Sequence, residues 1–567
     1  MRYKLLIILS FCTNILLCQS TVYPQYPNPV KIPVYLSATF AELRNNAFHA
    51  GVDIKTQGVE GKEVFAVADG YVSRIGVSPY GYGKVLYITH NDGFTSVYAH
   101  LSKFNKVIGE FVKNKQYEDE SFTQNIILEK DKFPIKKGDF LGFTGNSGGS
   151  GGPHLHYEIR YTNTQEPINP LYFGLKIKDT KSPNIKGLAI YPMKNACVNN
   201  DNSPQDMKVL NNDGKYYVDK SVFTANGNVA FGINVYDQAD GSNNKNGAYS
   251  IELFADNDLI FNIISDKYSY GETRYINSLI DYSHYINEKE RFIRTEIDEF
   301  NKLNLYEKRN GVVAINHGDT LNMKYVVKDY EGNASILNFT LIGVEPLDIK
   351  QETVSLSSDC HCINDGQHAT ICLDDLEVEI PKEAFYRDIC IETSQSDTLK
   401  NICSNYIYQI GSEDIPLHKR ITLRIRPNEK YLSDTTIYIA AVGKNGVCSF
   451  LGNKIVDGFV EAKTNVLGRY VIVRDTVTPL IKPVNFKNNS SIAENWSLRV
   501  KIEDKETGIK DYAMYVNNEW VLADYDAKNN LLIYQIDNHV KDGDNNLKLV
   551  VTDMVGNKNI YSTTLTR

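Results

Sequence analysis

A glycine-rich turn leads directly into an alternating strand at Gly151-Gly152-Pro153-His154-Leu155-His156-Tyr157-Glu158-Ile159-Arg160. Successive side chains of a strand point to opposite faces, so the apolar residues of this stretch fall on one face. His154 and His156 therefore share the other face. Two imidazoles on one strand face, just after such a turn, favour a functional site. The alternative is a pair of solvated surface histidines.

Two upstream pieces add further candidates. The first is Phe48-His49-Ala50-Gly51-Val52-Asp53, in which His49 and Asp53 lie on one face of either a strand or a helix. Gly51 leaves room for a close approach of another backbone. The second piece, 87–101, is predicted to be a β-hairpin turned at 91–93, with His100 at the end of the returning strand. His90 is interpreted as a turn or supporting residue, not as a ligand.

These three pieces hold five of the eleven histidines. A catalytic zinc needs three protein ligands and one open position for water, and mixed histidine and carboxylate ligation suits zinc. Zinc lowers the pKa of its bound water to ~7. Further histidines beside the open position can take a proton or stabilise an oxyanion. The three pieces together supply enough groups for both tasks.

Length and composition predict a multidomain, mainly β chain. Its 567 residues are too many for one core, and 42% hydrophobic with 23% charged residues indicates a globular protein. The 37 tyrosines and short β-branched runs favour strands. The net charge of −8, without a basic stripe, argues against a nucleic-acid partner.

An internal repeat divides the rest of the chain. The run 179–185 (Asp-Thr-Lys-Ser-Pro-Asn-Ile) matches 475–481, and 326–333, which ends in Asp-Tyr-Glu-Gly-Asn, matches 550–557. Paired matches at both ends predict β-sandwich (Ig-like) domains at 175–346 and 475–567, with the Gly-Asn stretch as the turn before the last strand. The first copy is lengthened by 267–312, in which 287–309 is either an inserted helix or an irregular loop. A Cys-containing β-rich domain is predicted between the copies, at 347–474.

The N-terminus and the cysteines indicate export. Residues 1–20 have the positive start, short apolar run and small or polar end of a signal peptide, and Cys18 leaves lipid anchoring open. No other apolar run is long enough to span a membrane. Six cysteines lie between 360 and 448, so we expect one to three disulfides there. The alternative is a metal site at Cys360-His361-Cys362 with His368 and Cys372, which lacks the usual zinc spacings.

The ordered motifs resemble the lysostaphin-type (LytM-domain) zinc metallopeptidases over Ala47 to Tyr172. The motifs that carry the resemblance are His49-x-Gly51-x-Asp53, Val64-Phe65-Ala66-Val67-Ala68-Asp69-Gly70, Gly83-Lys84-Val85, His90-Asn91-Asp92-Gly93, Tyr98-Ala99-His100-Leu101, Lys137-Gly138-Asp139, Gly142-Phe143-Thr144-Gly145-Asn146-Ser147-Gly148 and Gly152-Pro153-His154-Leu155-His156. One departure is the connection from Leu101 to Gly138, which is longer than usual and is expected to form a loop or small excursion.

The resemblance implies a compact, mostly antiparallel β domain, placed at 30–174, with a Zn²⁺ in a groove. It assigns His49, Asp53 and His156 as zinc ligands, and His100 and His154 as the catalytic pair. It also implies that the substrate is a peptide of the bacterial wall, from a peptidoglycan stem or cross-bridge.

The leading functional hypothesis is an exported zinc endopeptidase that hydrolyses peptidoglycan cross-links, in the periplasm, at the cell envelope or secreted. One alternative is a non-catalytic wall-binding or hydrolase-activating protein with a structural zinc site. Another is a protease of non-wall proteins. The C-terminal β domains are expected either to bind a wall or protein partner or to act as spacers.

Overall fold

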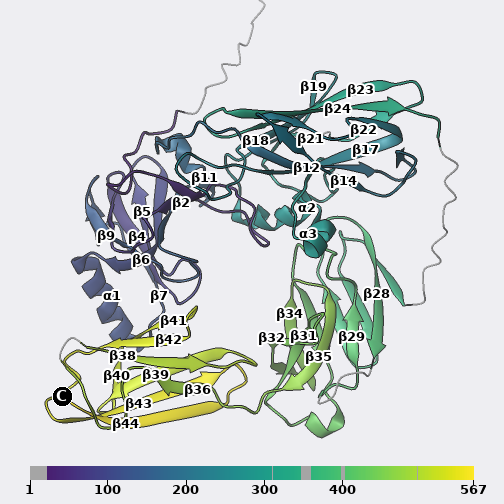
Figure 1. Cartoon of the computed structure of the whole chain (residues 1–567). Coiled ribbons are helices and arrows are strands. Elements are labelled where there is room, and N and C mark those ends of the chain that lie inside the picture. Colours follow the sequence, from purple (N-terminus) through teal and green to yellow (C-terminus); the bar gives the residue numbers. More distant parts are fainter. Residues whose placement is uncertain (1–21, 310, 347–358, 397–401, 494–495) are drawn as a thin grey trace, which may run out of the picture.

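The computed structural model describes residues 22–309, 311–346, 359–396, 402–493 and 496–567, and four blocks of β structure follow one another along the chain (Figure 1). The predicted signal peptide and Cys18 lie outside the described residues. The expected mainly β fold, a compact antiparallel domain followed by further β domains, is confirmed. Within the described ranges, no helix has both the length and the apolar character needed to cross a membrane.

The first block is one antiparallel sheet of long and short strands, with the central order β1-β2-β10-β6-β5-β4-β7. Its elements are β1 (Leu36–Ala38), β2 (Val52–Lys55), β3 (Glu63–Phe65), β4 (Gly70–Val77), β5 (Lys84–His90), β6 (Phe94–Phe104), α1 (Lys106–Glu118), β7 (Gln124–Ile127), β8 (Pro134–Ile135), β9 (Phe140–Thr144), β10 (His154–Tyr161), β11 (Pro167–Ile168) and η1 (Pro170–Phe173). The predicted hairpin is β5–β6, turned at 91–93.

Strand β10 lies between β2 and β6, and both of its faces are buried. The strand predicted from alternation is therefore correct. Its polar face is not a solvent face, because 155–160 are all buried. A buried row of polar side chains has to be satisfied within the protein, so this face must hold partners or a ligand.

The long connection after β6 contains the helix α1 rather than only a loop. Asn105 caps it by accepting a hydrogen bond from the backbone N–H of Ile108 at 2.9 Å. Ile108, Val112 and Gln116 recur every four residues and form its buried side. The charged residues between them led the sequence interpretation toward a loop.

The second block is a 13-stranded sheet system with the central order β14-β12-β17-β24-β23-β18-β19-β21. Its elements are β12 (Asn184–Pro192), β13 (Cys197–Val198), β14 (Gln205–Lys208), β15 (Leu210–Asn212), β16 (Lys215–Tyr217), β17 (Val222–Tyr236), β18 (Ser250–Ala255), β19 (Asp258–Ile264), η2 (Tyr270–Tyr275), α2 (Ile276–Leu279), α3 (Tyr282–Glu288), β20 (Ile293–Arg294), β21 (Tyr306–Arg309), β22 (Val313–Ile315), β23 (Thr320–Lys328) and β24 (Ala334–Gly343).

An inserted helix over 287–309 was one of two readings, and it is wrong. Helix α3 ends at Glu288, and the run continues as irregular chain with the short strands β20 and β21. Ile293 pairs with Ile233 of β17, and Phe292 is buried against Ala189 and Ala230. Burial of these side chains against the sheet overrides the helical spacing of the apolar residues.

The third block consists of two sheets, β25-β28-β29-β35-β31-β32 and β26-β27-β30-β34-β33, packed on one apolar core. Its elements are β25 (Cys360–Ile363), β26 (Ala369–Leu373), β27 (Leu376–Ile380), β28 (Ile389–Ser396), β29 (Ile407–Ile410), β30 (Ile421–Ile425), η3 (Glu429–Tyr431), β31 (Ile437–Val442), β32 (Cys448–Gly452), β33 (Lys454–Val456), β34 (Phe459–Thr464) and β35 (Gly468–Arg474).

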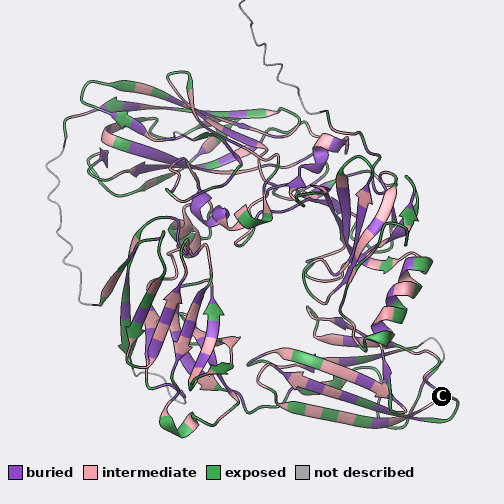
Figure 2. Cartoon of the chain, turned by 180° about the vertical axis from the view of Figure 1, so that it is seen from behind, coloured by how far each residue is buried: buried purple, intermediate pink, exposed green. Residues whose placement is uncertain are grey.

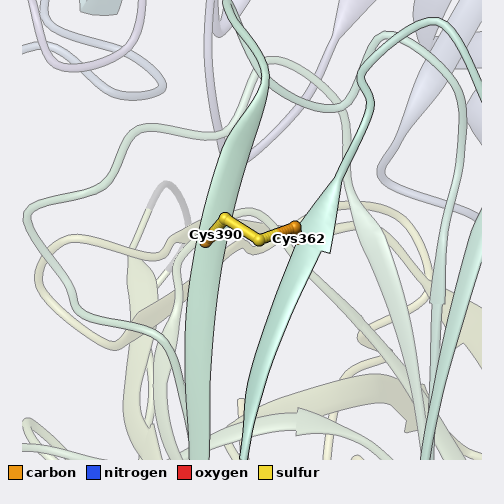
Figure 3. The surroundings of a disulfide bond; sticks show 2 residues. All are labelled: Cys362 and Cys390. Atoms are coloured by element: carbon orange, nitrogen blue, oxygen red, sulfur yellow. A yellow bond between two sulfur atoms is a disulfide. The ribbon is translucent and has the colours of Figure 1, made fainter. Parts of the chain in front are cut away.

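The expectation of a disulfide in this block is confirmed. Cys362 of β25 and Cys390 of β28 lie opposite each other in the pairing register and are bonded (Figure 3). Cys360, Cys372, Cys403 and Cys448 are free thiols. A zinc site using Cys362 is thereby excluded.

The fourth block repeats the two-sheet plan, with β36-β38-β42-β41 facing β37-β44-β43-β39-β40 across one core. Its elements are β36 (Leu480–Pro483), β37 (Ser490–Ser491), β38 (Ser497–Glu503), β39 (Ile509–Val516), β40 (Glu519–Val521), β41 (Ala523–Asp526), β42 (Leu531–Gln535), β43 (Asp544–Asp553) and β44 (Lys558–Thr566).

The internal repeat extends to side-chain hydrogen bonds. The Gly-Asn stretches form the turns of the β23–β24 and β43–β44 hairpins, as predicted. Asn333 donates through its amide to Asp329 Oδ2 at 2.7 Å and to the carbonyl of Asp179 at 3.3 Å. Asn557 makes the same two contacts, to Asp553 at 2.8 Å and to the carbonyl of Asp475 at 3.0 Å. The two copies are thus built on one plan.

The blocks are arranged around an open centre, with the fourth next to the first, as the views from both sides show (Figures 1 and 2). Tyr117 of α1 donates to Asp537 at 2.7 Å and stacks on His539, and Lys84 pairs with Asp524 at 2.9 Å. On the other side, Phe40 and Phe48 belong to the apolar core of the second block. The first block is therefore held from two sides.

Candidate metal centre

Strand pairing brings the predicted residues together. His156 of β10 lies opposite Asp53 of β2 in the antiparallel register, and it lies opposite Ala99 of β6 on the other side. His100 follows Ala99 directly, and His49 precedes β2 by three residues. Three segments far apart in sequence thus place all five predicted residues in one small region.

Three donor atoms converge in this region. His156 Nδ1 lies 2.8 Å from Asp53 Oδ1, and His49 Nε2 lies 3.1 Å from the same oxygen. The two imidazole nitrogens are 3.0 Å apart. His49, Asp53 and His156 are 9%, 8% and 5% exposed. Two histidines and a carboxylate thus meet at one point away from bulk water.

The outer hydrogen bonds decide which ring nitrogens carry protons. His49 Nδ1 lies 2.8 Å from the carbonyl oxygen of Thr39, so it must be the N–H donor of a neutral ring. His156 Nε2 lies 2.8 Å from the Glu158 carboxylate and donates in the same way. His49 Nε2 and His156 Nδ1 then present lone pairs, beside the carboxylate of Asp53. In these neutral tautomers three electron-pair donors face one point, and together they make up a cation site.

The donor set fits zinc. Two imidazoles and one carboxylate are ligands that zinc accepts in catalytic sites, and each histidine is oriented by an oxygen acceptor behind it. Without a cation, the buried groups of this cluster shift one another's pKa strongly. Burial opposes ionisation of Asp53, but its three histidine neighbours hold its pKa well below the usual range. Burial also opposes protonation of His156, while Asp53 and Glu158 raise its pKa to about 9, so without a metal its Nδ1 holds a proton at neutral pH that a bound cation has to displace.

His100 and His154 stand beside this donor set. Their ring centroids are 4.8 Å apart, and His154 Nε2 lies 3.4 Å from Asp53 Oδ1. His100 Nδ1 lies 2.8 Å from the carbonyl of Ser147, and His154 Nδ1 lies 2.9 Å from that of Gly152. Both rings therefore hold their proton on Nδ1 and leave Nε2 as an acceptor. Burial, then His156 and His154, lowers the pKa of His100 to about 3.

The backbone at His100 is unusual. Its φ is +58°, in the left-handed region that non-glycine residues rarely adopt. The pairing of β6 with β5 shifts register between Tyr98 and Leu101, and its pairing with β9 shifts register between Leu101 and Lys103. Such local strain is kept where it aims a functional side chain. This backbone conformation of His100 could not be predicted from the sequence, even from a correct prediction of which strands pair.

Sequence reasoning gave no role to the residues that support the site from behind. Glu158 is fully buried, and it accepts from His156, from Tyr82, from Arg160 at 2.6 Å and from Tyr270 at 3.1 Å. Burial opposes its ionisation, but Arg160 and then His156 hold its pKa at about 2. Glu158 shares the strand face of the histidines, so alternation alone could have found it. No sequence signal points to Tyr270, which belongs to the second block.

His90 lies outside the donor set, as interpreted. Its Nδ1 lies 3.1 Å from the carbonyl of Asp69, and its Nε2 lies 2.7 Å from Ser96 Oγ. Burial lowers its pKa. His90 therefore links the end of β5 to the backbone at Asp69 and to Ser96 of β6.

Gly51 is required by the close packing of β2 on β10. A Cβ at this position would lie 2.3 Å from the carbonyl oxygen of Tyr157 and 2.8 Å from Glu158 Cγ. We expect Gly51→Ala to push the two strands apart, to lower the unfolding free energy by about 1–3 kcal/mol and to weaken metal binding. Thermal unfolding and metal content test this. Gly109→Ala on α1 is the control, because its Cβ meets nothing closer than 3.9 Å, and it should be neutral or slightly stabilising.

Glu158 provides a second test of the site. Glu158→Gln keeps the shape but removes the charge that orients His156 and neutralises Arg160. We expect zinc affinity to fall by about 10–100-fold, the usual cost of losing such an outer partner. Competition with a chromophoric chelator measures it. Glu129→Gln, at an exposed position of the same block, should leave affinity unchanged. An unchanged affinity in Glu158→Gln would contradict the orienting role.

Two family models match the chain. The model of peptidase family M23 matches residues 47–117, and a Zu5-like domain model matches 361–475. The second match covers most of the third block. The metal-centre residues His49, Asp53 and His100 lie inside the first match.

Several curated proteins are similar to the first block. DD-carboxypeptidase/endopeptidase Mpg of Neisseria gonorrhoeae is 32% identical over 127 residues, which are 22% of this chain and 23% of that protein. Murein hydrolase activator NlpD of Escherichia coli is 30% identical over 123 residues, 22% of this chain and 25% of that protein. The chain spans about a quarter of the length of these relatives. The catalytic domain of lysostaphin from Staphylococcus simulans is 25% identical, over 27% of this chain and 89% of that one, with a TM-score of 0.17.

The family match falls on the stretch that carries His49, Asp53 and His100 of the candidate centre. The geometry of that centre suits a metallopeptidase, since two histidines and a carboxylate present their lone pairs to one point. The first block of this chain therefore carries a match to peptidase family M23 at residues 47–117, in agreement with its resemblance to the lysostaphin-type (LytM-domain) metallopeptidases.

Proposed function

We propose that the chain is a zinc-dependent endopeptidase that hydrolyses peptide cross-links of bacterial peptidoglycan. In this proposal His49, Asp53 and His156 hold the zinc, and His100 and His154 are the catalytic pair. The observation that carries it is the set of hydrogen-bond partners of the four histidine rings, which indicates the ring nitrogen that bears the proton in each. Two histidines offer lone pairs with Asp53 to one point, and two more stand beside that point with their Nδ1 atoms held by backbone carbonyls and their Nε2 atoms turned away from those carbonyls.

Bound zinc would supply a nucleophilic water at neutral pH and polarise the scissile carbonyl. The remaining tasks fall to the chain. His100 holds its proton on Nδ1 against Ser147, so its Nε2 is free to accept a proton. Its pKa of about 3 keeps the ring in this basic form at neutral pH. His154, fixed by Gly152, is the neighbouring proton carrier, and Asp53 lies 3.4 Å from its Nε2.

The names of the relatives support a wall substrate. Mpg is named a carboxypeptidase and endopeptidase, and NlpD a murein hydrolase activator. Together with the signal peptide expected at 1–20, they favour a protein exported to the periplasm, the cell envelope or the medium. The substrate would be a stem or cross-bridge peptide. The third and fourth blocks would then bind a wall or protein partner or space the first block from it.

The similarity to NlpD favours a second candidate function. In it the domain binds and activates another wall hydrolase, and its metal is structural. The presence of all five site residues speaks for the enzyme.

The test uses purified full chain and isolated sacculi. We expect new amino termini to be released, release to stop on chelation and to return with zinc, and unrelated folded proteins to remain uncut. Mass analysis of the released fragments identifies the bond. A zinc-loaded chain that cleaves no type of wall, but accelerates a second hydrolase, would establish the activator instead.

A further inference from the structure

Three carboxylates meet in the second block, far from the metal centre in sequence. They belong to Asp179, Asp237 and Asp329, here called the acidic triad, and each offers an oxygen within 4.8 Å of the others. Asp179 precedes β12, Asp237 follows β17, and Asp329 follows β23. Three strand ends thus bring like charges to one place.

One oxygen of Asp237 has no partner in the described part of the chain, and the backbone N–H of Gln238 and the charge of Lys181 offset the repulsion only in part. The residue is 4% exposed, and its Oδ1 is buried without a hydrogen-bond partner. Burial, then Asp179 and Asp329, raises the pKa of Asp237 to about 7. A buried, unpartnered carboxylate oxygen facing two other carboxylates is costly unless a cation compensates it.

A separate side chain points to the same ligand. Asn246 is 3% exposed, and neither its Oδ1 nor its Nδ2 has a partner among the described residues. Asn246 and the acidic triad line one cavity of about 20 Å³. That is room for a single water-sized occupant. Carboxylate and amide oxygens are the ligands of hard divalent cations, and of Ca²⁺ in particular.

The second copy of the repeat shows what the first lacks. Asp475, Asp504 and Asp553 form the corresponding cluster. There the chain turns at once after Asp504, and its Oδ1 accepts from the backbone N–H groups of Thr507 and Gly508 at 2.8 and 3.0 Å. After Asp237 the chain continues instead as a loop, 238–249. No residue of this loop donates a hydrogen bond to Asp237 Oδ1. The second block gives internal donors to Asp179 and Asp329 but leaves Asp237 Oδ1 without one, whereas the fourth block satisfies Asp504 Oδ1.

We propose that the acidic triad, completed by Asn246, binds one Ca²⁺ ion. The ion takes the place of the backbone donors that the loop 238–249 does not provide. It holds the loop at Asp237, where the loop begins, and at Asn246 within it. Because the ion has only oxygen ligands, it is distinct in chemistry from the histidine site.

The loop so fixed reaches the segment that orients a residue of the metal centre. Ser242 donates to the carbonyl of Leu36 at 3.0 Å, and Gly247 N–H donates to Thr39 Oγ1 at 3.1 Å. The carbonyl of Thr39 in turn accepts from His49 Nδ1. Calcium in the second block would therefore steady the first block at Thr39. This consequence holds whether the first block is an enzyme or an activator.

Calcium titration of the zinc-loaded full chain, freed of other divalent ions, tests the proposal. We expect one Ca²⁺ per chain, weaker binding of Mg²⁺, and a rise of about 5 °C in the unfolding midpoint at saturation. Asp237→Asn should weaken binding at least ~10-fold. Asp219→Asn, an exposed change in the same block, and Asp504→Asn in the other copy should bind as the parent does.

Two further measurements separate binding from misfolding. Without calcium, Asp237→Asn should unfold at a higher temperature than the parent, because it removes like-charge repulsion; with calcium the order should reverse. Hydrogen exchange at 238–249 should slow on adding Ca²⁺ to the parent alone. No calcium bound at millimolar concentration, or equal binding by Asp237→Asn, would overturn the proposal.

Discussion

His156→Ala is expected to lose the metal and, with it, cleavage of the wall. His156 supplies one of the three converging lone pairs, and its ring also joins Asp53 to Glu158 at 2.8 Å on each side. Its removal leaves the buried Glu158 carboxylate without the Nε2 donor of His156. Loss of a supporting residue costs up to ~100-fold, so loss of the ligand itself should exceed that. Zinc content after gel filtration and release of amino termini from sacculi measure the two effects.

The matched control is His317→Ala, which removes an exposed histidine of the second block. It should keep both zinc and activity. A circular dichroism spectrum and unfolding midpoint of His156→Ala that match those of the parent would show that a ligand, and not the fold, has been lost. Full activity of His156→Ala with bound zinc would remove this residue from the proposed ligand set.

The parts of the site predictable from sequence are those that follow strand periodicity. Alternation along 154–160 correctly gave a strand with both histidines on one face. The hairpin turn at 91–93 and the two Gly-Asn turns followed from local turn chemistry. The disulfide partners could not be deduced, because Cys362 and Cys390 meet only through the pairing of β25 with β28.

The parts that sequence could not supply are contacts between segments distant along the chain. Thr39 orients His49 through a backbone carbonyl, which no side-chain pattern reveals. Tyr270 reaches Glu158 from another block, across 112 residues. The helical spacing in 287–309 misled for the same reason, since the sheet beneath Ile293 decided its conformation. Periodicity reports local conformation, whereas the support of a site depends on packing.

His100→Ala should separate catalysis from metal binding. The ring of His100 is fixed by Ser147 and lies beside the proposed ligands His49, Asp53 and His156 without belonging to that group. We therefore expect zinc content to stay at the parent's level while wall cleavage falls by about 10²–10⁴-fold, the usual contribution of a positioned acid–base group. Alanine adds no new backbone strain, because histidine already occupies the same left-handed conformation.

The pH profile makes this prediction specific to His100. Because burial and the neighbouring histidines hold the pKa of His100 near 3, its ring is unprotonated throughout roughly pH 5 to 8. The ratio of parent to His100→Ala activity should therefore be constant over that range, while both activities fall together in acid as protons compete with zinc for its ligands. A ratio that changes with pH would mean that His100 titrates during turnover. Loss of zinc in His100→Ala would instead make it a ligand and exclude the divided site.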